Sequence, residues 1–268
     1  GPQPMKISAV VVLSMAARCA AALQPSRLHP STPRAPAPRA SLLTSVSAGL
    51  VAASGALAWA APAHGLSTCG LAASDLSALS TMRTVGCWQL CSAAVMLAGR
   101  GGASHASGFG LLAASLATLA NVANWDVLDR PLSNQLPGVL VMALLGKLTL
   151  DGAVGARWGA GVYLLLGGLI YLDPRTTIST VYAITKPVSA AGYSLLAASG
   201  ATIVATGVYL VGLAYGLSQP QSLAALLLTN SAVALKWVLA EAGGLGASKL
   251  GALGWAAVSA LLSALAFK

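Results

Sequence analysis

The sequence predicts an all-α fold, a polytopic bundle of six to eight Ala/Gly-rich transmembrane helices. Of the 268 residues, 56% are hydrophobic and 8% are charged, whereas about 25% of a soluble domain is charged. The mean hydropathy is +0.77, and apolar runs long enough to cross a bilayer recur along the chain. No alternating pattern indicates a membrane β-barrel. A soluble enzyme, a disulfide-rich secreted domain and a disordered protein are therefore excluded.

The net charge of +9 is divided unequally between two parts of the chain. Residues 1–63 hold five basic and no acidic side chains, whereas residues 64–268 hold ten basic and six acidic ones. The basic residues stand singly between apolar runs and form no stripe with interleaved aromatics, so nucleic acid is excluded as a partner. The acid-free first part instead indicates targeting.

Residues 5–22 predict a secretory signal peptide. We expect translation to start at Met5, and residues 1–4 are set aside. Lys6 precedes a short apolar run, which is followed by small residues around Ala22. A basic start, a short apolar core and a small-residue end are typical of such a signal, and the run is too short to span a bilayer.

Residues 23–41 predict a transit-like disordered segment, with a disordered luminal linker as the alternative. They contain five prolines, three arginines, three serines and no acid, a composition that cannot bury a core. Segment 5–41 therefore resembles the bipartite presequence of algae whose plastids have extra bounding membranes, although Leu23 stands where an aromatic residue is usual. The resemblance implies a plastid membrane, thylakoid or inner envelope; the endomembrane system is the alternative.

Residues 42–63 allow two interpretations. The apolar run ends in Ala61-Pro62-Ala63, which suits a third targeting signal cleaved after Ala63. The same Ala-, Ser- and Gly-rich composition suits a first transmembrane helix. No twin arginine precedes the run, which argues against a Tat-type signal.

Residues 64–268 predict the multi-pass transmembrane domain. Its five prolines fall between apolar runs or in their first turn, where a missing N–H costs least. The run 188–217 is either one tilted helix or a pair broken near Gly200, and 136–150 is short for a bilayer. Helices are expected at 76–98, 106–124, 136–150, 155–172, 188–217, 222–240 and 250–267.

Two small-xxx-small motifs predict close helix packing in this domain. Gly155 and Gly159 form one motif, and Gly212 and Gly216 form the other. Glycines allow backbones to approach closely, which matters in lipid because helices gain no hydrophobic energy by associating there. The Ala and Gly content as a whole predicts a tightly packed bundle of thin helices.

Two Lys–acid pairs are the candidates for an ion or solute pathway. Lys147 and Asp151 share a helix face at i,i+4, and Glu241 follows Lys236 at i+5. Ionisable residues within membranes are functional candidates by default. The alternative is that both lysines reach the headgroups and pair locally at helix ends.

The surroundings of the two pairs hint at a weak internal duplication. In each case a Ser- and Gln-containing turn opens a helix that carries the lysine, and the acid, a Gly-rich turn and another helix follow. The spacing from Gln to Lys is 12 residues after Gln135 and 17 after Gln219, so the match needs a gap. Transporter folds are often built from such repeats.

No residues are expected to be catalytic or to bind a metal. Cys87 and Cys91 are spaced i,i+4 rather than as a C-x-x-C redox pair, and the three histidines cannot form a zinc set. P-loop, dinucleotide, G-x-S-x-G and H-E-x-x-H motifs are absent. We therefore expect no enzyme, and a lipid-modifying enzyme with an unrecognised site is the weakest alternative.

The leading hypothesis is a multi-pass plastid protein that moves a small solute or ion, with the lipid bilayer as its main partner. The alternative is a non-catalytic subunit of a photosynthetic or translocation complex, or a homo-oligomer. No cofactor is predicted, but a subunit could hold lipid, carotenoid or chlorophyll. The possible pigment ligands are Gln89, His105, Asn121 and Asn124. Membership of the light-harvesting family is rejected, because the single Glu, Glu241, has no Arg beside it.

Overall fold

The described part of the chain is all-helical. The computed structural model describes residues 38–123 and 132–267, so segments 5–22 and 23–37 lie outside it. Helix α2 begins at Pro38 and therefore includes the last four residues of the segment expected to be disordered. The long helices of the described residues are α2 (Pro38–Ala60), α4 (Leu76–Ala98), α5 (Ala103–Ala123), α6 (Leu132–Leu150), α7 (Ala156–Leu172), α9 (Ala190–Ala214), α10 (Gln219–Ala240) and α11 (Leu250–Phe267).

Short elements connect some of these helices. They are α3 (Pro62–Thr68), a 3₁₀ turn η1 (Gly99–Gly101), α8 (Pro174–Thr176) and a π-helical turn η3 (Thr177–Val181).

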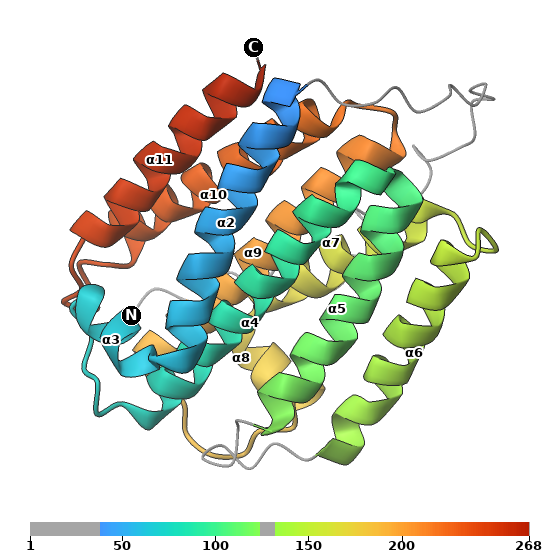
Figure 1. The fold of residues 1–268 in the computed structure, drawn as a ribbon. Helices are drawn as coiled ribbons and strands as arrows, with labels where there is room; N and C mark the ends of the chain where they lie inside the picture. Colours follow the sequence, from blue (N-terminus) through green and yellow to red (C-terminus); the bar gives the residue numbers. More distant parts are fainter. Residues whose placement is uncertain (1–37, 124–131, 268) are drawn as a thin grey trace. The chain divides into compact units, whose positions relative to one another are not determined.

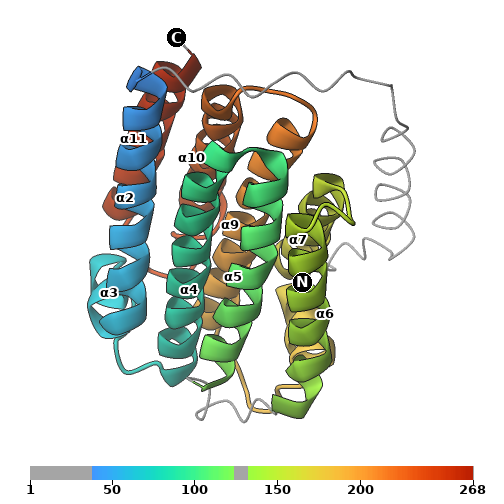
Figure 2. The ribbon, with the colours of Figure 1, turned by 45° about the vertical axis from the view of Figure 1, so that its right-hand side comes forward.

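From α4 onward, successive long helices run in opposite directions, and Figures 1 and 2 show α2 beside α4 and α6 at one edge of the bundle. The α10–α11 loop lies at the same end as α3, where the Ser248 N–H donates to the Cys69 carbonyl at 2.8 Å.

The predicted helix ranges from 76 to 267 agree with the structure to within a few residues. The 188–217 run is one continuous helix, α9, which agrees with the single-helix alternative and not with a break at Gly200. Helix α6 begins at Leu132, so Pro137 lies inside it and not in its first turn. Because Pro137 has no N–H, the Ser133 carbonyl loses its usual helical donor near the start of α6.

Five helices of the described residues are long and apolar enough to cross a membrane. They are α2, α5, α9, α10 and α11, and the apolar helix α7 is shorter, at 17 residues. These five support an integral membrane protein in a lipid bilayer. The expected six to eight spans are not confirmed by this criterion.

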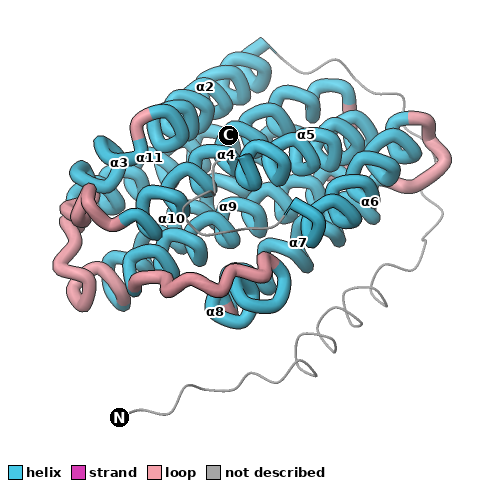
Figure 3. Tube along the Cα trace, turned by 90° about the horizontal axis from the view of Figure 1, so that it is seen from below, coloured by secondary structure: helices cyan, strands magenta, loops and turns pink. Residues whose placement is uncertain are grey.

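Helices α4 and α9 form the centre of the bundle, as Figure 3 shows from below. Most residues of both helices are buried. Their polar side chains are paired across the contact: the Thr206 hydroxyl donates to Ser92 at 2.9 Å, and Tyr209 donates to the Met96 carbonyl at 3.2 Å. Buried polar groups are therefore used to hold the two helices together.

Asp75 caps α4 and connects it to the start of α9. Its carboxylate accepts from the Ala78 N–H at 3.0 Å and from Ser77 at 2.8 Å, and the Ser189 N–H donates to the Ser77 hydroxyl at 3.0 Å. Partial burial opposes the charge, but hydrogen bonds from Ser189, Ala78 and Ser77 outweigh it and lower the pKa of Asp75.

Glycines on facing helices bring the helix backbones into contact, and the contact between α7 and α9 is the one that bears on the candidate functional site. A Cβ on Gly200 of α9 would lie 2.5 Å from the Tyr171 backbone nitrogen of α7, and one on Gly167 would lie 2.7 Å from the Val204 nitrogen. Helices α2 and α4 meet in the same way at Gly55 and Gly86. Such close approach is possible only without side chains.

The four glycines of the predicted motifs fall into two groups. Gly159 faces Ser107 of α5, and a Cβ on Gly212 would lie 2.6 Å from the Ser222 hydroxyl oxygen of α10. Gly155 is the N-cap of α7, and Gly216 follows the end of α9 with φ of 84°. A Cβ on either would meet nothing within 4 Å, so these two glycines lie at helix ends.

The predicted duplication is not confirmed. Helices α10 and α11 pack extensively against each other, whereas α6 and α7, the supposed equivalents, make few mutual contacts. Helix α6 packs on α5, and α7 packs on α9. The α6–α7 pair therefore does not pack as the α10–α11 pair does, whereas a duplication would predict the same packing.

Candidate functional site

A cavity of about 360 Å³ lies between α2 and α4 on one side and α9, α10 and α11 on the other, with the end of α7 beside it. Its walls are largely apolar. The side chains that shape them include Leu57, Met82, Val85, Ala198, Val233 and Trp255. A mostly apolar cavity of this size with a few polar groups is typical of a small-molecule site.

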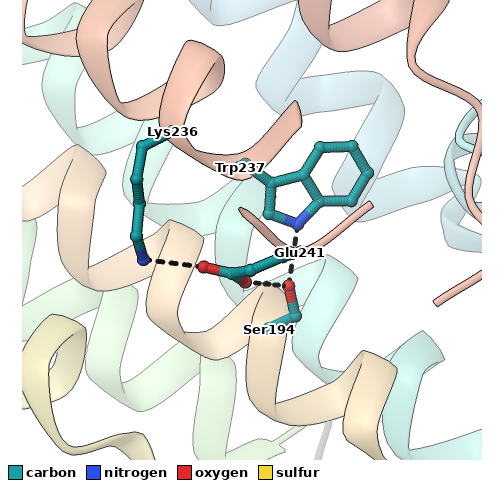
Figure 4. Close-up of polar contacts among 4 residues, drawn as sticks. All are labelled: Ser194, Lys236, Trp237 and Glu241. Atoms are coloured by element: carbon teal, nitrogen blue, oxygen red, sulfur yellow. Dashed lines mark hydrogen bonds and ion pairs between the residues drawn. The ribbon is translucent and has the colours of Figure 1, made fainter. Parts of the chain in front are cut away.

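Four residues on the cavity wall form a connected polar cluster, drawn in Figure 4. The Lys236 ammonium lies 2.7 Å from Glu241 Oε1. The Ser194 hydroxyl donates to Glu241 Oε2 at 2.7 Å and accepts from the Trp237 indole N–H at 2.8 Å. Both carboxylate oxygens of Glu241 thus have donors within the cluster, which we call the Lys236 cluster.

Helix ends bring this cluster together. Lys236 and Trp237 lie in the last turns of α10, and Glu241 is its C-cap with φ of −119°. The Trp237 carbonyl accepts from the N–H groups of Glu241 and Ala242 at 2.9 and 3.0 Å, so the helix stops winding there. The departure from helical geometry at Glu241 lets a side chain at i+5 reach back to Lys236. Ser194 lies near the start of α9.

The Lys236 ammonium is only partly covered by the protein. Its side chain is 49% exposed, against 27% for Glu241. The ammonium lies 5.0 Å from the centre of the Tyr171 ring, a contact that favours a cation over an aromatic face. The pair is neutral as a whole, but one face of the cation is accessible from outside the pair.

Two amides add hydrogen-bonding capacity to the cavity wall. The Gln89 side-chain oxygen accepts from Ser54 at 2.9 Å. Within the described chain, the Gln89 amide nitrogen and the Asn230 side chain have no protein partner, and both residues line the cavity. Both therefore have hydrogen bonds to offer a ligand.

The second predicted pair lies elsewhere. Lys147 and Asp151 form an i,i+4 ion pair at 2.6 Å, with side chains that are 71% and 51% exposed. Neither residue lines the cavity. They lie where α6 ends, at the opposite end of the bundle from the end of α10 (Figure 1). The structure therefore forms both ion pairs but does not bring them into one pathway.

Sequence reasoning missed Ser194, Tyr171 and Trp237. Trp237 is adjacent to Lys236, and an indole beside an intramembrane lysine was a usable signal. Ser194 and Tyr171 come from α9 and α7, and no local spacing connects them to α10.

The remaining polar candidates are scattered. Cys87 and Cys91 are buried in α4, and the Cys91 sulfur lies 3.0 Å from the Tyr163 hydroxyl oxygen. His105 packs beside Phe109, and Asn121 is buried with an unpartnered Oδ1. Asn124 lies outside the described residues. No group of three or more His, Cys, Asp or Glu residues that could hold a metal occurs within the described ranges.

Comparison of the chain with protein-family models, with curated proteins and with solved structures gives no significant match.

Proposed function

We propose that this protein is a multi-pass membrane protein that binds a small solute in the cavity between α2, α4, α9, α10 and α11 and moves it across the bilayer. One observation carries the proposal: a cavity of about 360 Å³ has an accessible lysine and amide groups with unused hydrogen-bonding capacity in a largely apolar wall. An ionisable residue within the membrane and a cavity with a few polar groups are both candidates for a functional site by default.

We further propose that all eight long helices of the described residues cross the membrane. Helix α4 is central, and its hydroxyls are satisfied locally: Thr81 donates to the Ser77 carbonyl at 3.0 Å, and Thr84 to that of Ser80 at 3.2 Å. Satisfied hydroxyls make a helix less polar in lipid than its composition indicates. An eight-span bundle would place both ends of the domain on one side of the membrane.

Residues 42–63 belong in this proposal as the first span and not as a removed signal. Helix α2 contributes Ser54, Leu57 and Ala58 to the cavity. Cleavage after Ala63 would cut within α3, where Pro62 and Leu66 are buried. N-terminal sequencing of the mature protein would identify a start before residue 42 if α2 is retained, and a start at His64 would contradict it.

The proposed location is a plastid membrane, thylakoid or inner envelope, and it depends only on the composition of residues 5–41. Expression of the full chain with a C-terminal fluorescent tag in an alga with a complex plastid tests it. Signal confined to the endoplasmic reticulum would contradict the plastid location and leave the transport proposal intact.

Transport requires that the cavity open to each side in turn, and this can be tested without knowing the solute. Ala234 lines the cavity on α10, whereas Ala232 on the same helix is exposed on the outside of the bundle. With the four native cysteines replaced by Ala, we expect Ala234→Cys to react with a membrane-impermeant maleimide added to either side of sealed vesicles. Ala232→Cys, facing lipid, should not react. Labelling of Ala234→Cys from one side only, or from neither, would contradict transport.

A further inference from the structure

The Lys236 cluster and the cavity walls together identify the kind of molecule that fits. We propose that the cavity takes an amphipathic monocarboxylate, with its apolar body between α4, α9 and α11 and its carboxylate at the Lys236 ammonium. This inference depends on the proposed function, since it names the ligand class of the same cavity.

The apolar body follows from the walls. Met82 and Val85 of α4, Ala198 of α9 and Trp255 of α11 line the cavity with apolar and aromatic side chains. Wall hydroxyls are already used: Thr202 donates to the Ala198 carbonyl at 3.1 Å and Thr68 to that of His64 at 2.9 Å. A sugar or a small ion would leave its own polar groups unpaired against these walls, at a cost of several kcal/mol for each group in an apolar medium.

The sign of the head group follows from which member of the ion pair is more accessible to a ligand. Glu241 has a donor on each oxygen, Lys236 on Oε1 and Ser194 on Oε2. The Lys236 ammonium has three N–H groups, of which Glu241 takes one. An incoming carboxylate therefore finds unused donors on the half-exposed cation, whereas an incoming amine would have only the spare lone pairs of the more covered Glu241, whose side chain is 27% exposed.

The free amides strengthen this asymmetry. The Gln89 amide nitrogen, whose companion oxygen is taken by Ser54, can only donate. Asn230 adds two further N–H donors on α10. Within the described chain, the two amides thus offer four N–H donors against one unpartnered oxygen, that of Asn230, and these donors match the acceptor oxygens of an acid.

A matched set of probes tests the head group on the full chain in lipid nanodiscs. Radiolabelled decanoate, decanol and decylamine share one apolar chain and differ only in the head, and empty nanodiscs give the partition background. We expect decanoate to bind at least about tenfold more tightly than decanol, the ratio expected when a hydrogen bond to a charged group is gained. Equal or tighter binding of decanol or decylamine would overturn the inference.

Variants of the two members of the ion pair distinguish binding from structural support. Lys236→Met, which retains the apolar stem, should weaken decanoate binding about tenfold or more. Glu241→Gln removes the competing carboxylate and should tighten it. A pair with a purely structural role would make both variants bind more weakly and would overturn the inference. Lys147→Met is the matched control, because that lysine is also ion-paired but lies outside the cavity, and its decanoate affinity should be unchanged.

The two proposals fail separately. Two-sided labelling of Ala234→Cys together with no preference for decanoate would retain transport and overturn the ligand class. One-sided labelling with tight, Lys236-dependent decanoate binding would overturn transport and retain the binding site.

Discussion

The two Lys–acid pairs of this protein are similar in kind, each with an acid four or five residues after a lysine near a helix end, but their surroundings are very different. Among the described residues, Lys147 and Asp151 pair only with each other at the end of α6, and both side chains are more than half exposed. Lys236–Glu241 is joined by Ser194 and Trp237 and lies on the wall of a cavity. The first pair has partners from one helix only, whereas the second has partners from α7, α9 and α10.

This difference indicates which kind of ion pair is the better candidate for a functional site. An exposed pair within one helix contributes about 0.2–1 kcal/mol and needs no further explanation. A pair whose members are held by side chains from other helices has a defined geometry, and a half-exposed cation in it is available to a ligand. Changes in α7 and α9, which supply those partners, should therefore affect the Lys236–Glu241 pair and leave the Lys147–Asp151 pair unchanged.

The largest effect is expected from the helix contact behind the Lys236 cluster. Gly200→Ser places a side chain against the Tyr171 backbone, which should separate α7 from α9 and destabilise the fold by about 1–3 kcal/mol. The matched control is Gly155→Ser near the Lys147 pair, where the added atoms meet nothing within 4 Å and Ser is a favoured N-cap. We expect the control to change stability by less than about 0.5 kcal/mol. Thermal unfolding in detergent measures both, and equal melting temperatures would contradict the contact.

A smaller effect is expected from removing each acid. Glu241→Ala leaves Lys236 and Ser194 without their acceptor and should cost about 1–2 kcal/mol. Asp151→Ala removes only an exposed pair and should cost less than about 0.5 kcal/mol. Denaturation of both variants in the same detergent gives the two values. If the ranking is reversed, the Lys236 cluster is not the more strongly coupled of the two.

The smallest effect is expected from Asp75, the carboxylate that connects the starts of α4 and α9. Its pKa is lowered in the folded state, so its ionised form adds stability above the ordinary Asp pKa of about 3.9. That contribution is lost as the pH falls through the lower, folded pKa. Because solvent screens Asp75, we expect less than about 1 kcal/mol.

The Asp75 effect is isolated by comparison with Asp75→Asn, which retains a cap at α4 but does not ionise. Melting temperatures of the two proteins should converge as the pH falls from 6 to about 3. A constant difference across this range would show that Asp75 does not titrate with unfolding.

The helices and the site differ in how far they could be predicted. Helix α4 was expected at 76–98 and occupies Leu76–Ala98, because apolar runs and helix hydrogen bonds are local in sequence. The Lys236–Glu241 contact follows from spacing once the helix ends at Ala240. Ser194 was not predictable as a site residue, and Gln89 was singled out only as a possible pigment ligand, because both reach the cavity from other helices. Pro137 was expected in the first turn of a helix over 136–150, but α6 begins at Leu132, before the apolar run, so the run alone did not locate the start of the helix.

The sequence by itself determined that this is an all-helical protein with membrane-spanning segments, because composition and run length decide whether a chain can satisfy its backbone in lipid. It also determined that Lys147 and Lys236 each have an acid within reach. Only the tertiary structure decided which pair lines a cavity. That choice depends on close approach at Gly200 and Gly86, which positions α7 against α9 and α2 against α4. Contacts between distant parts of the chain leave no pattern in local spacing, so they appear only when the helices pack.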